Sequence, residues 1–355
     1  MPSDHKVIGT RWVFKVKADG KFKARLVVQG WSQIHESQRL LLALATAKDW
    51  AVFALDVQVA FLNGELQESV YCKQAPGFEK THPTTGQPYL RSMGFTPTIS
   101  DPCIYSKGSN DTYIMLSLFV DDILITGPTD KLLMDVRNQL MNKFTITDLG
   151  EVSLILGMEV LRNRQEGTLQ LSQYKYVLSV LERFGMSSAN PTKTPGVKTD
   201  PTTTGEDSAL LDTAATKEST TGTMFFLANG LVHFSPRLQK ITATSTAEAE
   251  LIALAACAKQ GTYLLNICRE LGFQLDNFEV RSNNRGALHL AANSNYSNRS
   301  KHIAIRFAAL RDWIRSNQLV IDHVASADQL ADILTKHCER VVFTQLRSKV
   351  LTFGK

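Results

Sequence analysis

The stretch "LSLFVDDILITG", residues 116–127, places two adjacent carboxylates in an otherwise apolar segment. The density of β-branched and apolar residues from Thr112 to Gly127 predicts a β-hairpin with Asp121 and Asp122 at its tip. Burying a carboxylate is costly unless a cation or hydrogen-bond donors compensate it. A solvated turn is the ordinary explanation of such a pair. Acids in comparable apolar segments elsewhere in the chain would instead favour a cation-binding site.

A third acid, Asp56, lies in a comparable apolar segment, "FALDVQVAF" at residues 53–61. Two apolar strands that each carry acid at one point fit a two-metal site, in which carboxylates hold Mg²⁺ ions about 4 Å apart. Mg²⁺ prefers oxygen ligands and completes its shell with water and substrate phosphates. Such a site would lower the pKa of a 3′-hydroxyl and stabilise a leaving pyrophosphate. Asp56, Asp121 and Asp122 are therefore candidate metal ligands and catalytic residues.

Composition sets wide bounds. A chain of 355 residues can form two or three domains, and 43% hydrophobic with 21% charged residues is ordinary for a globular protein. The net charge of +5 permits a polyanionic partner without requiring one.

Five scattered cysteines without a CxxC pair predict neither a disulfide partner nor a zinc site, and favour a reducing compartment. We find no signal peptide, and no apolar run near the roughly 20 residues that span a bilayer. We therefore expect a soluble protein without a membrane partner.

Hydrophobic patterns predict the elements of the first half. Alternating apolar and basic residues around "ADG" at 18–20 predict a hairpin over 6–30. A helix is expected over 39–50, a buried strand from 51 with a turn at Asn63–Gly64, and a loop over 74–112. Amphipathic helices are expected over 128–144 and 174–185. Their apolar faces comprise Leu132, Leu133, Val136 and Leu140 in the first, and Tyr174, Val177, Leu178, Leu181 and Phe184 in the second.

Residues 187–223 are dominated by Thr, Ser, Pro and Gly and are predicted to be a linker. Beyond them we expect short strands over 223–235, a long helix over 245–271 and a strand over 278–284. A helix over 301–316, a strand over 318–325 and a short helix over 328–336 follow. Mixed strands and helices on both sides of the linker indicate two α/β units.

Several motifs carry a family resemblance. "GTRWVFKVKADGKFKARLV", "LDVQVAFLNGEL", "FVDDILITG" and "LGMEV" resemble the reverse transcriptase of copia-type LTR-retrotransposon Pol polyproteins. "STAEAELIALAACAKQ", "SKHIAIR" and "DQLADILTK" resemble the RNase H domain that follows it. The resemblance runs in family order from about residue 7 to residue 340. It implies an α+β fold, with right-hand-like fingers and palm followed by a degenerate RNase H-like α/β domain.

The resemblance implies an RNA-directed DNA polymerase that uses Mg²⁺, an RNA template, a DNA primer or RNA–DNA hybrid, and dNTPs. The polymerase acids of the family map to Asp56, Asp121 and Asp122. The basic hairpin corresponds to the fingers, where Arg25 is the best match to a phosphate-binding arginine. For the other basic residues, a solvated strand face remains an even alternative. The candidate nucleotide- and phosphate-binding residues are Lys15, Lys17, Lys23 and Arg25.

In the RNase H-like part, the resemblance implies four acids around two metals. Glu250 and Asp332 match two of them, and His302 matches a recurring family histidine. Asn283 stands where the family has Asp, and we find no counterpart of the strand that carries the first aspartate. Hydrolysis of RNA by this part is therefore not expected. For Glu250, the first turn of a helix after a Ser245-x-x-Glu248 capping box is an alternative explanation.

The chain also lacks segments that the family carries. Gaps fall before residue 37, between residues 80 and 90, where a palm helix is expected, and across the thumb and connection. The implied domains are an internally deleted fingers and palm at 1–186, a linker or thumb-connection remnant at 187–223, an RNase H-like domain at 224–340 and a tail at 341–355. The alternative function is a non-catalytic remnant that at most binds nucleic acid. The expected location is cytoplasmic or nuclear, or in element-derived particles if the parent element is intact.

Overall fold

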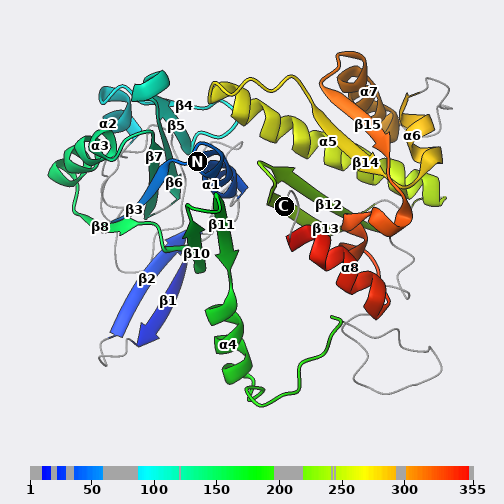
Figure 1. Ribbon diagram of the computed structural model, residues 1–355, viewed down its shortest axis with the longest axis horizontal. Coiled ribbons are helices and arrows are strands. Elements are labelled where there is room, and N and C mark those ends of the chain that lie inside the picture. Colours follow the sequence, from blue (N-terminus) through cyan, green and yellow to red (C-terminus); the bar gives the residue numbers. More distant parts are fainter. Residues whose placement is uncertain are drawn as a thin grey trace, which may run out of the picture. The chain divides into compact units, whose positions relative to one another are not determined.

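The computed structural model describes residues 10–16, 22–28, 36–58, 87–119, 121–195, 219–240, 243, 245–292 and 301–351. Of residues 10–16, 22–28, 87–88 and 301–306 it describes the backbone alone. The fold is mixed α/β, with antiparallel sheets and one parallel strand pair (Figure 1). Packing divides the chain into two compact units. The first comprises Met1–His35, Trp50–Pro97 and Cys103–Val152, and the second Glu36–Asp49, Thr98–Pro102 and Ser153–Lys355.

The basic segment near the N-terminus forms two antiparallel strands, β1 (Thr10–Val16) and β2 (Phe22–Val28). Their register pairs Lys15 with Lys23 and Val13 with Arg25. The two strands of the predicted hairpin are thus confirmed. The turn at Asp19–Gly20 lies outside the described residues.

A six-stranded sheet in the order β4-β5-β6-β7-β3-β8 forms the centre of the first unit. Its strands are all antiparallel to their neighbours, and the hairpin predicted over 112–127 is its middle. The bounds are β3 Ala51–Val57, β4 Thr96–Pro97, β5 Ile104–Lys107, β6 Ile114–Phe119, β7 Asp122–Gly127 and β8 Ile146–Glu151.

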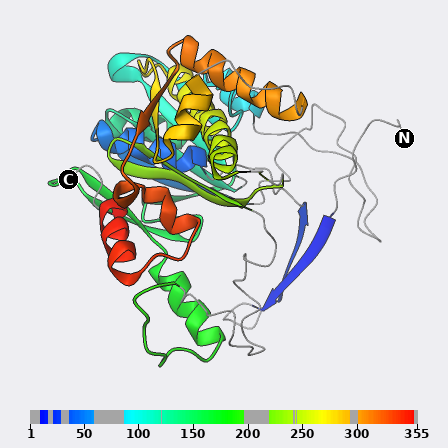
Figure 2. The ribbon, with the colours of Figure 1, turned by 90° about the vertical axis from the view of Figure 1, so that its right-hand side faces the viewer.

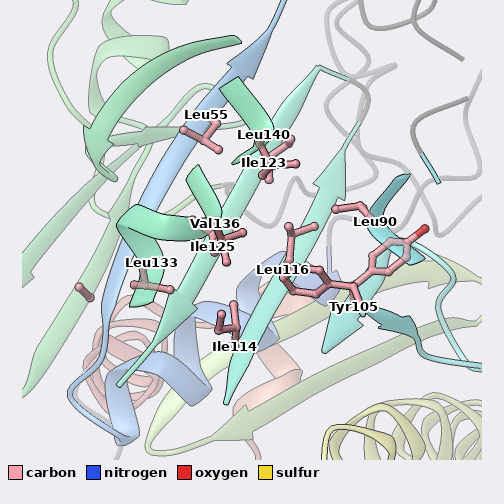
Figure 3. Close-up of a cluster of buried hydrophobic side chains, with 12 residues drawn as sticks. Leu55, Leu90, Tyr105, Ile114, Leu116, Ile123, Ile125, Leu133, Val136 and Leu140 are labelled. Atoms are coloured by element: carbon pink, nitrogen blue, oxygen red, sulfur yellow. The ribbon is translucent and has the colours of Figure 1, made fainter. Parts of the chain in front are cut away.

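Helix α3 (Asp130–Lys143) covers one face of this sheet. Its predicted apolar face is confirmed, because Leu133, Val136 and Leu140 are buried against Leu116, Ile125 and other strand residues (Figure 3). Leu116 and Ile125 are completely buried. Burial of this many aliphatic side chains, at about 25 cal/mol per Å² of apolar surface, fixes the strands that carry the acids.

The predicted loop over 74–112 is wrong from residue 87 onward, and residues 74–86 lie outside the described residues. The structure has helix α2 (Gln87–Ser92), strands β4 and β5, and a 3₁₀ turn η2 (Asn110–Thr112) there. The reason is burial: Leu90, Phe95 and Tyr105 enter the core of the sheet. Packing against that core outweighs a composition rich in turn-forming residues.

The second unit includes helix α1 (Glu36–Ala47), which confirms most of the helix predicted over 39–50. A three-stranded sheet joins β9 (Leu154–Ile155), β10 (Met158–Asn163) and β11 (Thr168–Ser172). Helix α4 (Tyr174–Arg183) lies where the second amphipathic helix was predicted, but none of its residues is buried. Its apolar face is therefore not part of a core in the described residues.

The rest of the second unit is built on one long helix, α5 (Thr246–Glu270), which confirms the prediction over 245–271. Strands β12 (Thr220–Leu227) and β13 (Gly230–Leu238) form an antiparallel pair, so the predicted linker range ends inside a strand. Strands β14 (Phe278–Ser282) and β15 (Leu319–His323) form a parallel pair. Two helices and two 3₁₀ turns complete this part: α6 Arg285–Ala292, α7 Lys301–Arg315, η4 Ser326–Asp328 and η5 Leu330–Leu334.

Two features of this part differ from expectation. The C-terminal tail contains helix α8 (Arg340–Leu351), and the short helix predicted over 328–336 is two 3₁₀ turns. Helix α5 is long and apolar enough to cross a membrane by length and composition, although no such run was recognised in the sequence. Half of its apolar window is buried, and Leu251, Leu254 and Ala258 belong to a hydrophobic core. Such burial is also typical of a core helix.

Candidate functional site

The candidate polymerase acids lie where β3 and the β6–β7 hairpin meet. Strand β7 begins at Asp122, and the antiparallel register places Asp56 of β3 directly opposite it. The amide of Val57 donates a hydrogen bond of 2.7 Å to the carbonyl oxygen of Asp121. Because opposite residues of a ladder share a face, with Cβ atoms about 5 Å apart, Asp56 and Asp122 are neighbours on one face of the sheet.

Electrostatics at this point are unfavourable without a cation. The pKa of Asp122 is raised above its ordinary value, first by burial and then by the negative charges of Asp56 and Asp121. All three acids therefore interact, although Asp56 is distant in sequence from the adjacent Asp121 and Asp122. A divalent cation would remove the repulsion, and carboxylate oxygens are the ligands that Mg²⁺ prefers.

The side chains do not yet form a metal-binding group. Within the described residues, no three His, Cys, Asp or Glu side chains lie close enough together to hold a metal ion. The donor chemistry thus fits Mg²⁺, while the positions of the carboxylates do not. Binding would require the side chains of Asp56 and Asp122 to turn toward a common point on their shared face.

An ion pair next to this site links α3 to β8. It was not predicted from the sequence. Arg137 of α3 binds Asp148 of β8, and its guanidinium lies 4.1 Å from the ring centroid of Phe53 in β3. Asp148 in turn pairs with Leu55, the residue before Asp56, across the β3–β8 ladder. Arg137 and Asp148 belong to different elements, so no local pattern could have predicted their pairing.

Three of the four candidate phosphate-binding residues have described backbones. Lys15, Lys23 and Arg25 lie at positions of the β1–β2 ladder that share one face, as their register shows. Lys17 lies outside the described residues. The ladder thus brings three basic positions together.

A second set of acids lies in the second unit. Glu250 of α5 and Asp332 of η5 interact, since Asp332 raises the pKa of Glu250 after burial, which is the larger cause. Lys336 lowers that pKa, and its Nζ lies 2.6 Å from Oδ2 of Asp332. A lysine ammonium therefore already neutralises part of the charge that a metal would meet here.

The other residues predicted for this set are not brought to it by any described contact. Asn283 donates a long hydrogen bond of 3.4 Å to Oγ of Ser326, and the side chain of His302 lies outside the described residues. The predicted cap of α5 is confirmed in part, because the amide of Glu248 donates to Oγ of Ser245 at 3.1 Å. An acid in the first turns of a capped helix is favourable in any case, so Glu250 keeps its alternative explanation.

A sheet with paired acids at a hairpin tip is typical of enzymes that handle phosphates with divalent metals. A family model described as "Reverse transcriptase (RNA-dependent DNA polymerase)" matches residues 1–87 and 81–198. The chain belongs to the reverse transcriptase family. That family generally uses divalent metal ions.

Individual relatives specify which kind of reverse transcriptase the chain is similar to. The chain is 28% identical to the "Retrovirus-related Pol polyprotein from transposon TNT 1-94" of Nicotiana tabacum, with 97% of this chain and 35% of the relative covered. The corresponding polyproteins from transposons RE1 and RE2 of Arabidopsis thaliana are 28% and 27% identical, each with 98% of this chain and 32% of the relative covered. The chain is thus similar to Pol polyproteins of copia-type retrotransposons and spans about a third of the length of these relatives.

The relatives also carry internal segments that have no counterpart in this chain. Each alignment extends over 469 positions, more than a hundred beyond the 355 residues of this chain, so the relatives carry segments that this chain lacks. The family model likewise matches in two pieces, which overlap over residues 81–87, inside the range where the palm helix was predicted to be missing. No solved structure gives a significant match to the chain.

Proposed function

We propose that this chain is, by descent, an RNA-directed DNA polymerase of a copia-type retrotransposon, in which Asp56, Asp121 and Asp122 hold two Mg²⁺ ions. The observation that carries the proposal is the register of β3 and β7, which puts Asp56 opposite Asp122 with Asp121 next to it. The partners are an RNA template, a DNA primer or RNA–DNA hybrid, and dNTPs.

Each group of residues would have a distinct task. When bound, Mg²⁺ would supply positive charge at the primer hydroxyl and at the leaving pyrophosphate. Asp56, Asp121 and Asp122 would position that charge, and the core under β3, β6 and β7 would keep their strands fixed. Lys15, Lys17, Lys23 and Arg25 would bind the triphosphate, for which guanidinium and ammonium groups are suited.

The proposed architecture assigns the first 186 residues to internally deleted fingers and palm, and residues 224–340 to an RNase H-like domain. Residues 187–223 are the linker or thumb-connection remnant between them, and 341–355 are a tail. We infer that the RNase H-like domain does not cleave RNA. Asn283 has no negative charge, and Lys336 pairs with Asp332 beside Glu250.

A non-catalytic remnant that at most binds nucleic acid is the second candidate. It is favoured by the missing segments and by the lack, in the described residues, of an assembled metal-binding group. For such a remnant the basic positions of the β1–β2 ladder would be the nucleic-acid contact. The proposed location is cytoplasmic or nuclear in both cases, with element-derived particles added if the parent element is intact.

Primer extension on an RNA template with Mg²⁺ separates the two candidates. The purified chain is compared with an Asp121→Asn, Asp122→Asn variant and with a Glu250→Gln, Asp332→Asn variant as the matched control. Extension that is lost only in the first variant supports the polymerase. A folded chain that extends no primer, yet binds RNA–DNA hybrid with an affinity that falls with salt, supports the remnant.

A further inference from the structure

Helix α4 carries an apolar face that is open to solvent. The helix follows β11 directly and extends beyond the end of that strand (Figure 1, Figure 2). None of its residues is buried. Tyr174 is 64% exposed and Phe184 65%, while Val177 and Leu178 are 50% and 46% exposed. Single exposed apolar residues are ordinary, but a cluster of them marks an interaction surface.

The exposed residues and the partly exposed Leu181 form one stripe along α4. Intervals of three, four and three residues separate its members, which are Tyr174, Val177, Leu181 and Phe184. This is the a and d pattern of a heptad, in which the side chains of one helix pack against a second helix. Leu178 borders the stripe, four residues after Tyr174. The pattern therefore indicates that the group covering α4 is another helix.

The apolar surface continues onto the neighbouring three-stranded sheet. Nζ of Lys175 lies 2.7 Å from Oε1 of Glu159 in β10, which places α4 beside the sheet face that carries Glu159. Leu154 pairs with Glu159, and Leu161 follows Glu159 by two residues, so both leucines lie on that face. Both are more than half exposed. The stripe, Leu178 and these two leucines together are called the α4 patch.

The size of the α4 patch is sufficient for a weak dimer. Two aromatic side chains of about 200 Å² each, two-thirds exposed, and four aliphatic ones that expose about 80 Å² each leave roughly 600 Å² of apolar surface on one copy. That is at the upper end of what monomers expose. Two copies would bury roughly 1,200 Å², which is the lower end of the range for specific interfaces.

The stripe is complementary to itself when two copies of α4 run antiparallel. Tyr174 of one copy then lies against Phe184 of the second copy. Val177 lies against Leu181 of the second copy in the middle of the helix. Aromatic rings thus meet at both ends of the pair, where offset or edge-to-face packing is favourable, and aliphatic side chains meet at the centre. A two-fold axis repeats each contact, as in other dimers of identical chains.

The charges beside the stripe select the antiparallel orientation. Lys175 and Glu182 lie seven residues apart, which is two helical turns, and so stand on the same side of α4. In an antiparallel pair each lysine approaches the glutamate of the second copy, whereas parallel helices would bring like charges together. The ammonium of Lys175 has three donors, so it can bind Glu182 of the second copy while it binds Glu159 of its own chain.

We propose that the α4 patch is a homodimer interface, in which the α4 helices of two copies of this chain pack antiparallel about a two-fold axis. A second copy is the occupant because the same side chains supply both halves of the seam and because the charges match only in a self-pairing that runs antiparallel. The interface is small, so the dimer dissociates in the micromolar range.

Sedimentation equilibrium of the full chain tests the proposal. We expect a shift from monomer to dimer as the concentration rises to about 100 μM. Val177→Glu places a charge at the centre of the seam and should weaken association about tenfold or more. Ser179→Glu adds the same charge to the same helix outside the stripe, so this matched control should associate normally. Circular dichroism checks that both variants are folded, and the measurement on the unaltered chain depends on neither.

Charge reversal tests the orientation of the two helices. Lys175→Glu and Glu182→Lys should each weaken self-association severalfold, because each variant brings like charges together across the axis. An equal mixture of the two variants should associate as well as the unaltered chain, since opposite charges then meet again. A mixture that associates no better than either variant alone would overturn the antiparallel arrangement.

Three further results would overturn the dimer itself. The folded, unaltered chain could remain a monomer at the highest concentration. Val177→Glu and Ser179→Glu could weaken association equally, which would assign the dimer to another surface. Finally, hydrogen exchange could show that the amides of α4 are protected in a dilute monomer, which would mean that the chain covers its own α4 patch.

Discussion

The two acid sets of this chain lie in units with different internal organisation. Asp56, Asp121 and Asp122 are carried by neighbouring strands of a continuous six-stranded sheet whose core is filled. Glu250 lines a cavity between two separate strand pairs, and Asp332 directly follows Ala331, which also lines it. Both sets join segments that are far apart in sequence, but only the first is carried by directly paired strands of one sheet.

The difference lies in how the structure holds the residues of each set in place. The first site pairs β3 with β7, which are far apart in sequence, and the buried core beneath the sheet holds that register. A site that needs a helix, two strands and a C-terminal turn loses its geometry when any one of them is missing. Asn283 carries no negative charge and Asp332 pairs with Lys336, so the second set offers less negative charge to a cation.

The largest expected effect is a loss of stability when a buried leucine is shortened, and it tests how tightly each unit is packed. Leu116→Ala in the filled core should lower the free energy of unfolding by about 3–5 kcal/mol, because it opens a cavity among close-packed side chains. Leu254→Ala should cost less, about 2 kcal/mol, because that side chain already borders empty space and loses fewer contacts. Urea denaturation of both variants measures the costs. Equal costs would mean that the cavity is filled in solution.

The ion pair that braces β3 should have the next largest effect. Arg137→Met leaves Asp148 without its cationic partner and should lower the free energy of unfolding by about 1–3 kcal/mol, as for other charge-assisted hydrogen bonds. Lys175→Met removes an exposed pair with Glu159 in the second unit and should cost less than about 1 kcal/mol. The same denaturation experiment compares them. If Arg137→Met left the free energy of unfolding unchanged, α3 would not stabilise the first site through this ion pair.

The parts of the fold and of the candidate site differ in how well the sequence predicts them. The hairpin over 112–127, the apolar face of α3 and the cap of α5 follow from local patterns and were predicted. Strands β4 and β5 were missed because turn-forming residues hid Phe95 and Tyr105, whose burial depends on the whole sheet. The cavity and the Arg137–Asp148 pair could not be predicted, since both depend on which distant segments come together.

A smaller effect concerns the charge at the first site. Because the folded-state pKa of Asp122 is raised, its ionisation opposes folding once the pH exceeds its ordinary pKa of 3.8. Asp122→Asn should therefore stabilise the metal-free chain at pH 7, and this gain should disappear below about pH 3.8. Denaturation at pH 7 and pH 3 measures it, with the exposed Asp111→Asn as the control. A stabilisation that persists at pH 3 would have another cause.

The smallest effect concerns the second site. Lys336→Met removes the positive charge that lowers the pKa of Glu250, so this pKa should rise further above its ordinary value. Stability should change by less than about 1 kcal/mol, because Lys336 is more than half exposed. Nuclear magnetic resonance titration of the Glu250 carboxyl carbon records the shift. An unchanged pKa would show that Lys336 does not act as the local cation.

The central claim is that the first acid set can still hold divalent metal and that the second cannot. Mn²⁺, which suits carboxylate sites as Mg²⁺ does, can be counted directly by electron paramagnetic resonance. The measurement compares the unaltered chain with Asp56→Asn, Asp122→Asn and with Glu250→Gln, Asp332→Asn. Saturable Mn²⁺ binding that disappears only in the first double variant is the predicted result. Binding that survives in the first variant and disappears in the second would contradict the account.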